Sequence, residues 1–162
     1  MGLLDSLLGS GGGLEVGAKA PSFTLKDQQG RTVSLADFAG KKNVVVYFYP
    51  KDDTPGCTKE SCTFRDQYTA FTDIGAEVLG ISSDSEQSHA KFAEKYKLPF
   101  PLLADTSGAV RNQFKVPKSL GLLPGRVTFV IDKQGVIRHV FNSQLNPTKH
   151  VDEAIGVLKT LS

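Results

Sequence analysis

The sequence predicts an α/β domain in which a mixed β-sheet lies between helices in a three-layer fold. Strand and helix patterns alternate along the chain from about Val16 onward. Residues 43–49 are a continuous run of mainly β-branched and aromatic residues, which is typical of a central strand buried on both faces. Two late strand patterns, 126–131 and 136–141, are joined by a short turn that indicates an antiparallel hairpin. Parallel crossovers are therefore followed by a terminal hairpin.

Each remaining element has its own local signal. A Gln-Gln-Gly turn predicts a first hairpin, Ser-Asp-Ser-Glu at 83–86 supplies a capping box, and Asn146-Pro147 begins the last helix. The elements expected besides those above are hairpin strands at 23–25 and 32–34, a helix from 55 or 57 to 72, a strand at 77–82, a helix ending near 97, a strand at 102–104, a helix at 107–114 and an amphipathic helix after 146.

The order β-α-β-α-β-α-β-β-α favours a thioredoxin-like arrangement, because that fold ends in an antiparallel hairpin and a helix. In such sheets the chemistry lies beyond the carboxyl ends of the strands, which places the loop 50–56 at the functional end. Residues 16–162 are expected to form this one domain. Residues 1–15, with a leucine patch and three consecutive glycines, are expected to be a flexible tail and not a signal peptide.

Composition argues against several functional classes. The formal net charge is +2 and the basic residues are scattered, so no nucleic-acid partner is expected. The longest apolar stretches are too short to span a bilayer. Two cysteines are too few for a disulfide-rich scaffold, and a pair of thiols indicates redox work in a reducing compartment. Histidines 89, 139 and 150 lack ligand-like spacing and are expected to be surface or packing residues.

The segment 49–62 carries the chemical signal. It passes from a strand, through a turn rich in proline and glycine, into the first turn of a helix that contains Cys57. Unpaired backbone N–H groups and the positive end of the helix dipole favour the thiolate there, and the thiolate is the nucleophile. Thr54 can place its hydroxyl near the sulfur, and Pro50 can shield the sulfur from bulk water.

Cys62 follows Cys57 by five residues, and this spacing constrains any bond between them. On an ideal helix the two Cα atoms would lie about 8 to 9 Å apart. A disulfide requires Cα atoms closer than about 7 Å. If the two cysteines react with each other, the helix must unwind locally. Simple packing on the helix face is the alternative role for Cys62.

At these residues the sequence resembles the peroxiredoxins. The motif Pro50-x-x-x-Thr54-x-x-Cys57 matches the active-site signature of that family at every position. The longer run 48–66 resembles the Q type, also called the bacterioferritin-comigratory-protein group. The resemblance extends from about residue 16 to residue 161.

The resemblance implies a role for each matched residue. Cys57 would be the peroxidatic cysteine, which attacks a hydroperoxide and becomes a sulfenic acid. Thr54 would hydrogen-bond the substrate and the sulfur, while Pro50 shields the pocket. Arg126 matches the distant arginine of the family, whose charge would favour the thiolate and orient the peroxide bond. Glu60 is a candidate for orienting this arginine.

The resemblance also implies a reaction cycle. Cys62 would be the resolving cysteine of an atypical 2-Cys mechanism, and thioredoxin or a similar dithiol would reduce the resulting intramolecular disulfide. Hydrogen peroxide and organic hydroperoxides would be the substrates, and no metal, haem or flavin cofactor is implied. A monomer is expected because the resolving cysteine is internal. A bacterial-type cytoplasm is the expected location, with a mature plastid protein as the alternative.

Two other functions remain open. A thiol–disulfide oxidoreductase acting on proteins would share the fold class and the cysteine at the start of a helix, although its usual motif is Cys-x-x-Cys. A redox-switched interaction module would use the unwinding of the helix to change a binding surface. Rapid reaction of the thiols with peroxide would distinguish a peroxidase from both of these alternatives.

Overall fold

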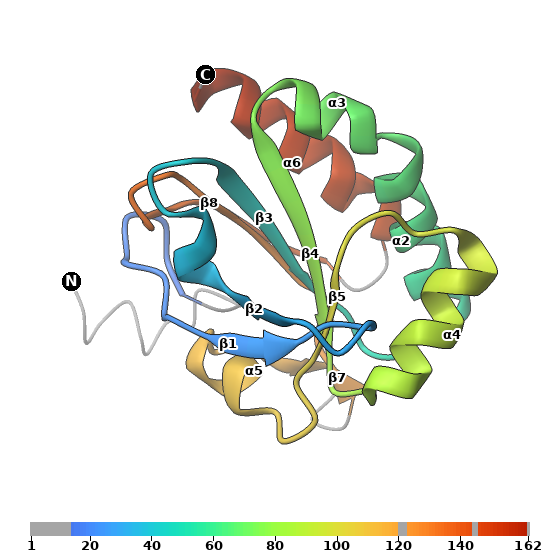
Figure 1. The fold of residues 1–162 in the computed structure, drawn as a ribbon. Helices are drawn as coiled ribbons and strands as arrows, with labels where there is room; N and C mark the ends of the chain where they lie inside the picture. Colours follow the sequence, from blue (N-terminus) through green and yellow to red (C-terminus); the bar gives the residue numbers. More distant parts are fainter. Residues whose placement is uncertain (1–13, 120–122, 144–145, 162) are drawn as a thin grey trace.

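A mixed β-sheet forms the middle layer of the protein in the computed structural model, which describes residues 14–119, 123–143 and 146–161 (Figure 1). Within these residues the main sheet has seven strands in the order β2-β1-β5-β4-β3-β8-β9. Their bounds are β1 Thr24–Lys26, β2 Thr32–Ser34, β3 Asn43–Phe48, β4 Ala76–Ser82, β5 Leu102–Ala104, β8 Val127–Ile131 and β9 Ile137–Asn142.

The directions of the strands place the carboxyl ends of β3, β4 and β5 at one edge of the sheet. Strands β3, β4 and β5 are parallel, whereas β8 runs antiparallel to β3 with Phe48 opposite Val127. The loop that follows β3 therefore lies beside the start of β8 and beyond the ends of β4 and β5. This is the arrangement in which open α/β sheets place their ligands.

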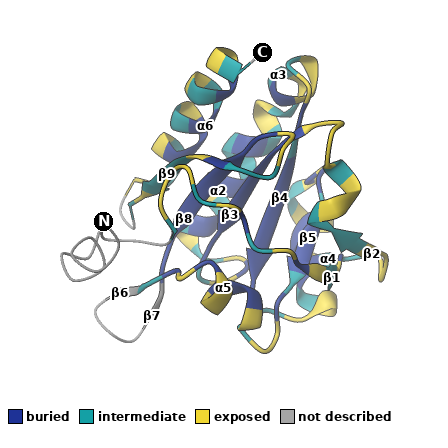
Figure 2. Cartoon of the chain, turned by 90° about the vertical axis from the view of Figure 1, so that its left-hand side faces the viewer, coloured by how far each residue is buried: buried dark blue, intermediate teal, exposed yellow. Residues whose placement is uncertain are grey.

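Helices cover both faces of the sheet. One face packs against α2 (Pro55–Asp66), α3 (Tyr68–Asp73), α4 (Glu86–Tyr96) and α6 (Pro147–Leu161). The other packs against α5 (Ala109–Gln113) and the segment that contains Ala20 and Phe23. Every residue of β3 is buried, as the continuous apolar run predicts, and Figure 2 shows the buried sheet between exposed helix surfaces. The predicted fold class, with its mixed sheet in three layers, is confirmed.

Most predicted elements are present. The first hairpin, the central strands and the terminal hairpin occur as expected. Ser85 is the N-cap of α4, and its hydroxyl accepts a hydrogen bond from the backbone N–H of Ser88 at 3.1 Å. The short 3-10 helix η1 (Leu35–Phe38) and the small antiparallel pair β6 (Lys118–Ser119) and β7 (Leu123–Pro124) were not predicted. They are too short to show a periodic pattern.

The single helix predicted from residue 55 or 57 to 72 is wrong, because the structure divides it into α2 and α3. The backbone leaves the helical path at Gln67, where φ is −102° and ψ is 6°. After this turn the Tyr68 hydroxyl donates a hydrogen bond to Glu77 Oε1 of β4 at 2.8 Å. A side-chain contact with the strand that follows α3 thus accompanies the break, and helical spacing alone does not reveal it.

The predicted N-terminal tail falls mostly on residues 1–13, which lie outside the described residues. Leu14 already contacts the domain, since its backbone N–H donates to the carbonyl of Phe114 at 3.2 Å. Among the described helices, none combines the length and the apolar character that crossing a membrane requires.

Candidate active site

Cys57 is the third residue of α2, directly after the loop that leaves β3. Thr54 is the N-cap with an extended backbone, and Pro55 occupies the first helical position, where its missing N–H costs no hydrogen bond. The Thr54 hydroxyl donates to the carbonyl of Lys51 at 2.9 Å, which closes the loop on itself. Cys57 is only 1% exposed and carries a free thiol. The local sequence therefore presents a protected thiol at a helix N-terminus, as predicted.

Sheet pairing brings Arg126 to this thiol. Because Phe48 lies opposite Val127, Arg126 enters the sheet beside the loop of Cys57. Its Nη1 donates to Glu60 Oε1 at 2.6 Å. Although burial works against the charged form, Glu60 and the Cys57 sulfur raise the pKa of Arg126, and the sulfur acts both by charge and as a hydrogen-bond partner. A permanent positive charge thus lies beside the Cys57 sulfur.

Gly56 makes room for this arginine. A Cβ atom at position 56 would lie 2.9 Å from Arg126 Nη2, which is closer than real Cβ contacts allow. Since Arg126 is 4% exposed and bound to Glu60, it cannot move aside freely. Glycine is required here by the close approach of the guanidinium.

Glu60 and His150 form the second layer around Arg126. Glu60 is fully buried, and its Oε2 accepts no hydrogen bond from the described residues. Burial raises the pKa of Glu60 to about 8, although Arg126 favours the carboxylate. His150 Nε2 donates to the carbonyl of Ser143 at 2.7 Å, so Nδ1 accepts from the Thr128 hydroxyl at 2.8 Å. Burial also lowers the pKa of His150 to about 4, which keeps the ring neutral at pH 7.

Arg111 is a second buried cation, and sequence reasoning missed it. Its Nη2 donates to the carbonyl of Tyr49 at 2.8 Å and its Nη1 to the carbonyl of Gly125 at 3.1 Å, so it joins the loop of Cys57 to the segment before β8. Burial lowers the pKa of Arg111, while negative charge at Asp105 and Cys57 acts in the opposite direction. The signal that could have identified Arg111 from the sequence is its position in a short predicted helix that follows the end of a strand.

Cys62 lies on α2, the same continuous helix as Cys57, and is partly buried with a free thiol. Burial raises the pKa of the Cys62 thiol, with Arg65 opposing and Asp66 reinforcing this shift. The folded helix therefore keeps Cys62 mainly as the thiol. Both predictions about this segment, an intact helix and separated thiols, agree with these observations.

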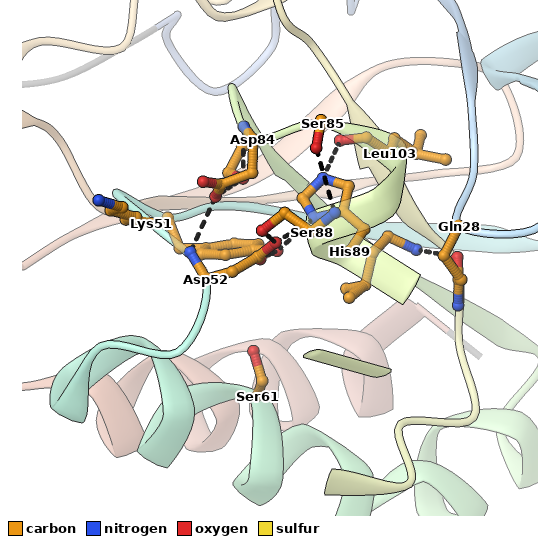
Figure 3. A network of polar contacts seen from close by, with 12 residues as sticks. Gln28, Lys51, Asp52, Ser61, Asp84, Ser85, Ser88, His89 and Leu103 are labelled. Atoms are coloured by element: carbon orange, nitrogen blue, oxygen red, sulfur yellow. Dashed lines mark hydrogen bonds and ion pairs between the residues drawn. The ribbon is translucent and has the colours of Figure 1, made fainter. Parts of the chain in front are cut away.

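The three histidines lie in two kinds of surroundings. His139 is partly exposed and pairs with Glu153 at 2.8 Å, but His89 and His150 are fully buried in polar networks. His89, Asp52 and Asp84 are the one group of described residues whose metal-ligand type atoms cluster, within 4.8 Å of one another. Their atoms already bond to protein groups, so we assign them no metal (Figure 3).

The environment of Cys57 decides the class of protein. A buried thiol at a helix N-terminus with a paired arginine beside it is an arrangement in which a cysteine can act as a nucleophile. On an open sheet of this topology, that chemistry is typical of a thiol-dependent oxidoreductase.

Comparisons with known proteins show to which family of thiol-dependent oxidoreductases the chain is similar. The model of the AhpC/TSA family matches residues 16–140. Over 146 residues the chain is 58% identical to the chloroplastic peroxiredoxin Q of Sedum lineare, covering 90% of this chain and 78% of that protein. The corresponding protein of Populus jackii is 55% identical over 146 residues, covering 90% and 68%. The crystal structure of peroxidoxin BcpB from Mycobacterium tuberculosis has 38% identity and a TM-score of 0.85, covering 92% and 99%.

The chain belongs to the AhpC/TSA family and is a peroxiredoxin, a thiol peroxidase, similar to peroxiredoxins of the Q type. The resemblance found in the sequence is thereby confirmed. Of the residues predicted for the site, Pro50, Thr54, Cys57 and Arg126 lie at the same edge of the sheet, and Cys62 lies one turn or more along α2.

Proposed function

We propose that the chain reduces hydrogen peroxide and organic hydroperoxides with Cys57 as the peroxidatic thiolate. The observation that carries this proposal is the contact of the buried Cys57 sulfur with Arg126, which Glu60 holds at 2.6 Å. The thiolate attacks the terminal peroxide oxygen, the O–O bond breaks, and the released alkoxide or hydroxide takes up a proton. Cys57 becomes a sulfenic acid. Arg126 stabilises the negative charge that moves from sulfur to the leaving oxygen.

Thr54 and Pro50 have supporting roles in this proposal. Thr54 already donates its hydroxyl proton to Lys51, so its oxygen retains lone pairs that can accept a hydrogen bond from the peroxide. Pro50 is half-buried between β3 and the loop, where it limits access of water to the sulfur.

The second half of the cycle is an atypical 2-Cys resolution. The Cys62 thiolate attacks the sulfur of the Cys57 sulfenic acid, an S–S bond forms, and the oxygen leaves as water after protonation. Because both residues lie on one helix, α2 must first unwind, and unwinding also releases Cys62 from the burial that raises its pKa. A dithiol reductant such as thioredoxin then reduces the disulfide. Since resolution is internal, one chain suffices for the cycle, and we propose a monomer.

We propose a plastid location for the protein. The similar proteins from Sedum lineare and Populus jackii are named chloroplastic. This supports the plastid alternative over the bacterial-type cytoplasm.

A single-turnover experiment tests the proposed cycle. Reduced protein is mixed with one equivalent of hydrogen peroxide, and thiol content and intact mass are followed, with Cys57→Ser and Cys62→Ser alongside. We expect the parent to lose both thiols, Cys57→Ser to lose none and Cys62→Ser to accumulate a sulfenic acid. A parent that keeps both thiols for minutes would exclude peroxidase chemistry at Cys57 and favour a protein-disulfide or redox-switch function.

A further inference from the structure

Arg111 belongs to α5, which packs on the face of the sheet opposite to the helix of Cys57, yet its side chain reaches the edge where the active site lies. Its Nη2 donates a hydrogen bond to the carbonyl oxygen of Tyr49 at 2.8 Å, and its Nη1 donates to that of Gly125 at 3.1 Å. Tyr49 follows the last residue of β3, and Gly125 directly precedes Arg126. One guanidinium therefore joins the segment that leads to the reactive cysteine with the segment that carries its arginine.

These two bonds begin where the pairing of β3 with β8 stops. Phe48 and Val127 are the last paired residues of the two strands at this end. The same register would place Tyr49 opposite Arg126, but the ladder ends before this step. The guanidinium of Arg111 thus connects the two strands by side-chain bonds at the point where backbone pairing no longer does so.

The position of Arg111 is itself fixed from two sides. Asp105 directly follows β5, is 2% exposed, and accepts hydrogen bonds from the backbone N–H groups of Val110 at 3.1 Å and Arg111 at 2.9 Å. At the other end of the side chain, Arg111 Cζ lies 5.7 Å from the centre of the Phe48 ring, within the range of a cation–π contact. Arg111 is therefore a rigid link between its two carbonyl partners.

Stability alone is a poor explanation for a buried guanidinium of this kind. Both of its bonded carbonyl partners are neutral, and its buried Nε has no hydrogen-bond partner among the described residues. Burial lowers the pKa of Arg111, while negative charge at Asp105 and then at Cys57 acts in the opposite direction. Because the desolvation of a charged group is costly and an apolar side chain avoids it, the guanidinium is better explained by the site that it adjoins.

We propose that Arg111 is a positioning residue of the peroxidase reaction, which holds the loop of Cys57 and the segment of Arg126 at the separation where the Arg126 guanidinium reaches the sulfur. Arg111 acts through Arg126 and through the backbone of the loop. Without Arg111 the two segments separate beyond their last ladder pair, and Arg126 loses its alignment with the thiolate and the peroxide. The inference rests on the proposed role of Cys57.

Two reactions of Cys57 measure this alignment. In a Cys62→Ser background Cys57 is the only thiol of the chain, so hydrogen peroxide and iodoacetamide both report on it. Peroxide reduction needs Arg126 at the breaking O–O bond, whereas alkylation needs only an accessible thiolate. For Arg111→Met at pH 7 we expect a peroxide rate constant about tenfold lower and an alkylation rate constant within about threefold of the parent. An equal fall of both, or no change in either, would overturn the proposal.

A double-mutant cycle tests whether Arg111 acts through Arg126. Arg111→Met should lower the peroxide rate constant about tenfold when Arg126 is present, but less than about twofold in an Arg126→Ala background. The same loss in both backgrounds would overturn the proposal, because Arg111 would then act on Cys57 independently.

Arg111→Lys separates the charge of the side chain from its two-pronged bonding. Lysine keeps the positive charge but lacks the planar fork that spans both carbonyl oxygens, so we expect its peroxide rate constant to stay about fivefold or more below that of the parent. Full peroxide reactivity in Arg111→Lys would show that charge alone suffices and would refute the positioning role.

Ile137→Ala is the control for general destabilisation. Ile137 is fully buried and lies opposite Ile131, at the end of β8 away from Arg126. Removal of its side chain should lower the midpoint of thermal unfolding by creating a cavity. Both rate constants should nevertheless stay within about twofold of the parent. If Ile137→Ala lost as much peroxide reactivity as Arg111→Met, the loss would reflect stability and the proposal would fail.

Amide hydrogen exchange of the full chain provides a readout that needs no peroxide. In Arg111→Met we expect faster exchange at the Phe48–Val127 end of the ladder and unchanged exchange at the Val44–Ile131 end. Equal exchange changes at both ends, or none, would overturn the link even if the reactive cysteine reduces peroxide normally. Faster exchange at the first end alone would support the link even if the parent proved unreactive toward peroxide, and in that case only the proposed function would fail.

Discussion

Two buried carboxylates flank Cys57, and they are used differently. Asp52 lies before the cysteine in the loop, and both of its oxygens are bonded, to Tyr49 on one side and to α4 on the other. Glu60 lies after the cysteine on α2, with one oxygen on Arg126 and the other without a partner among the described residues. Each also has a buried histidine nearby, at 2.7 Å from Asp52 and 3.6 Å from Glu60.

The difference indicates two separate tasks for the carboxylates near Cys57: Asp52 fixes the loop, and Glu60 orients Arg126. A fully bonded carboxylate holds the backbone where it is, because any movement would leave a buried charge without partners. Glu60 directs only one of its oxygens at the adjacent guanidinium, and burial raises its pKa to about 8. Asp52 therefore suits positioning, whereas Glu60 suits the orientation of Arg126 and its charge beside the sulfur.

Removal of Arg126 should give the largest effect on the Glu60 side. In Arg126→Ala the sulfur loses its positive partner and Glu60 its ion pair, so we expect the peroxide rate constant to fall about 10²- to 10³-fold. Stopped-flow kinetics measures this directly. Arg138→Ala removes an arginine whose partner, Asp132, lies outside the site, and should leave the rate unchanged. Equal rates in both variants would show that Arg126 does not act on the sulfur.

The burial of Glu60 predicts a pH-dependent stability. The pKa of Glu60 is raised from 4.5 to about 8 in the folded protein. The stability that the protonated side chain gives the folded protein is therefore fully present below pH 4.5 and is lost as the pH rises through 8. Relative to Glu60→Gln, the parent should lose roughly 2 to 4 kcal/mol of unfolding free energy across this window. Urea unfolding at pH 5, 6.5 and 8 measures the difference. A difference that stays constant with pH would contradict the raised pKa.

Gly56→Ala should lower both peroxide reactivity and stability. Alanine favours a helix over glycine by about 1 kcal/mol, yet its Cβ would displace Arg126 from its place beside Glu60. We expect peroxide reactivity to fall about tenfold and thermal stability to fall as well, because the buried ion pair between Arg126 and Glu60 is disturbed. Gly156→Ala, in α6 with open space around it, is the control and should raise stability without changing reactivity.

The smallest effect is expected from a substitution on the exposed side of the loop, next to Asp52. Asp53 is exposed and pairs with Lys95, and a surface pair of this kind contributes little. Lys95→Ala should therefore change neither peroxide reactivity nor the disulfide rate beyond about twofold. A larger change would mean that the outer side of the loop also takes part in anchoring.

The sequence predicted the parts of the site that depend on neighbouring residues. Proline and glycine around Thr54 specify the loop, and the helix start places Cys57 beside unpaired backbone N–H groups. Arg126 was assigned only through resemblance, because no local pattern connects it with a cysteine 69 positions earlier. Arg111, His89 and His150 were missed or taken as packing residues, since each acquires its partners from distant elements.

The sequence by itself determined the order of the main strands and helices, the position of Cys57 at a helix start and the separation of the two cysteines along a helix. These follow from periodicity, capping and backbone geometry, which act over a few residues. Only the tertiary structure decided which charges surround the thiol. The antiparallel pairing of β3 with β8 brings in Arg126, and the packing of α4 and α6 on one face of the sheet brings in two histidines. Burial then fixes the protonation states of Glu60 and His150, because desolvation depends on the whole fold.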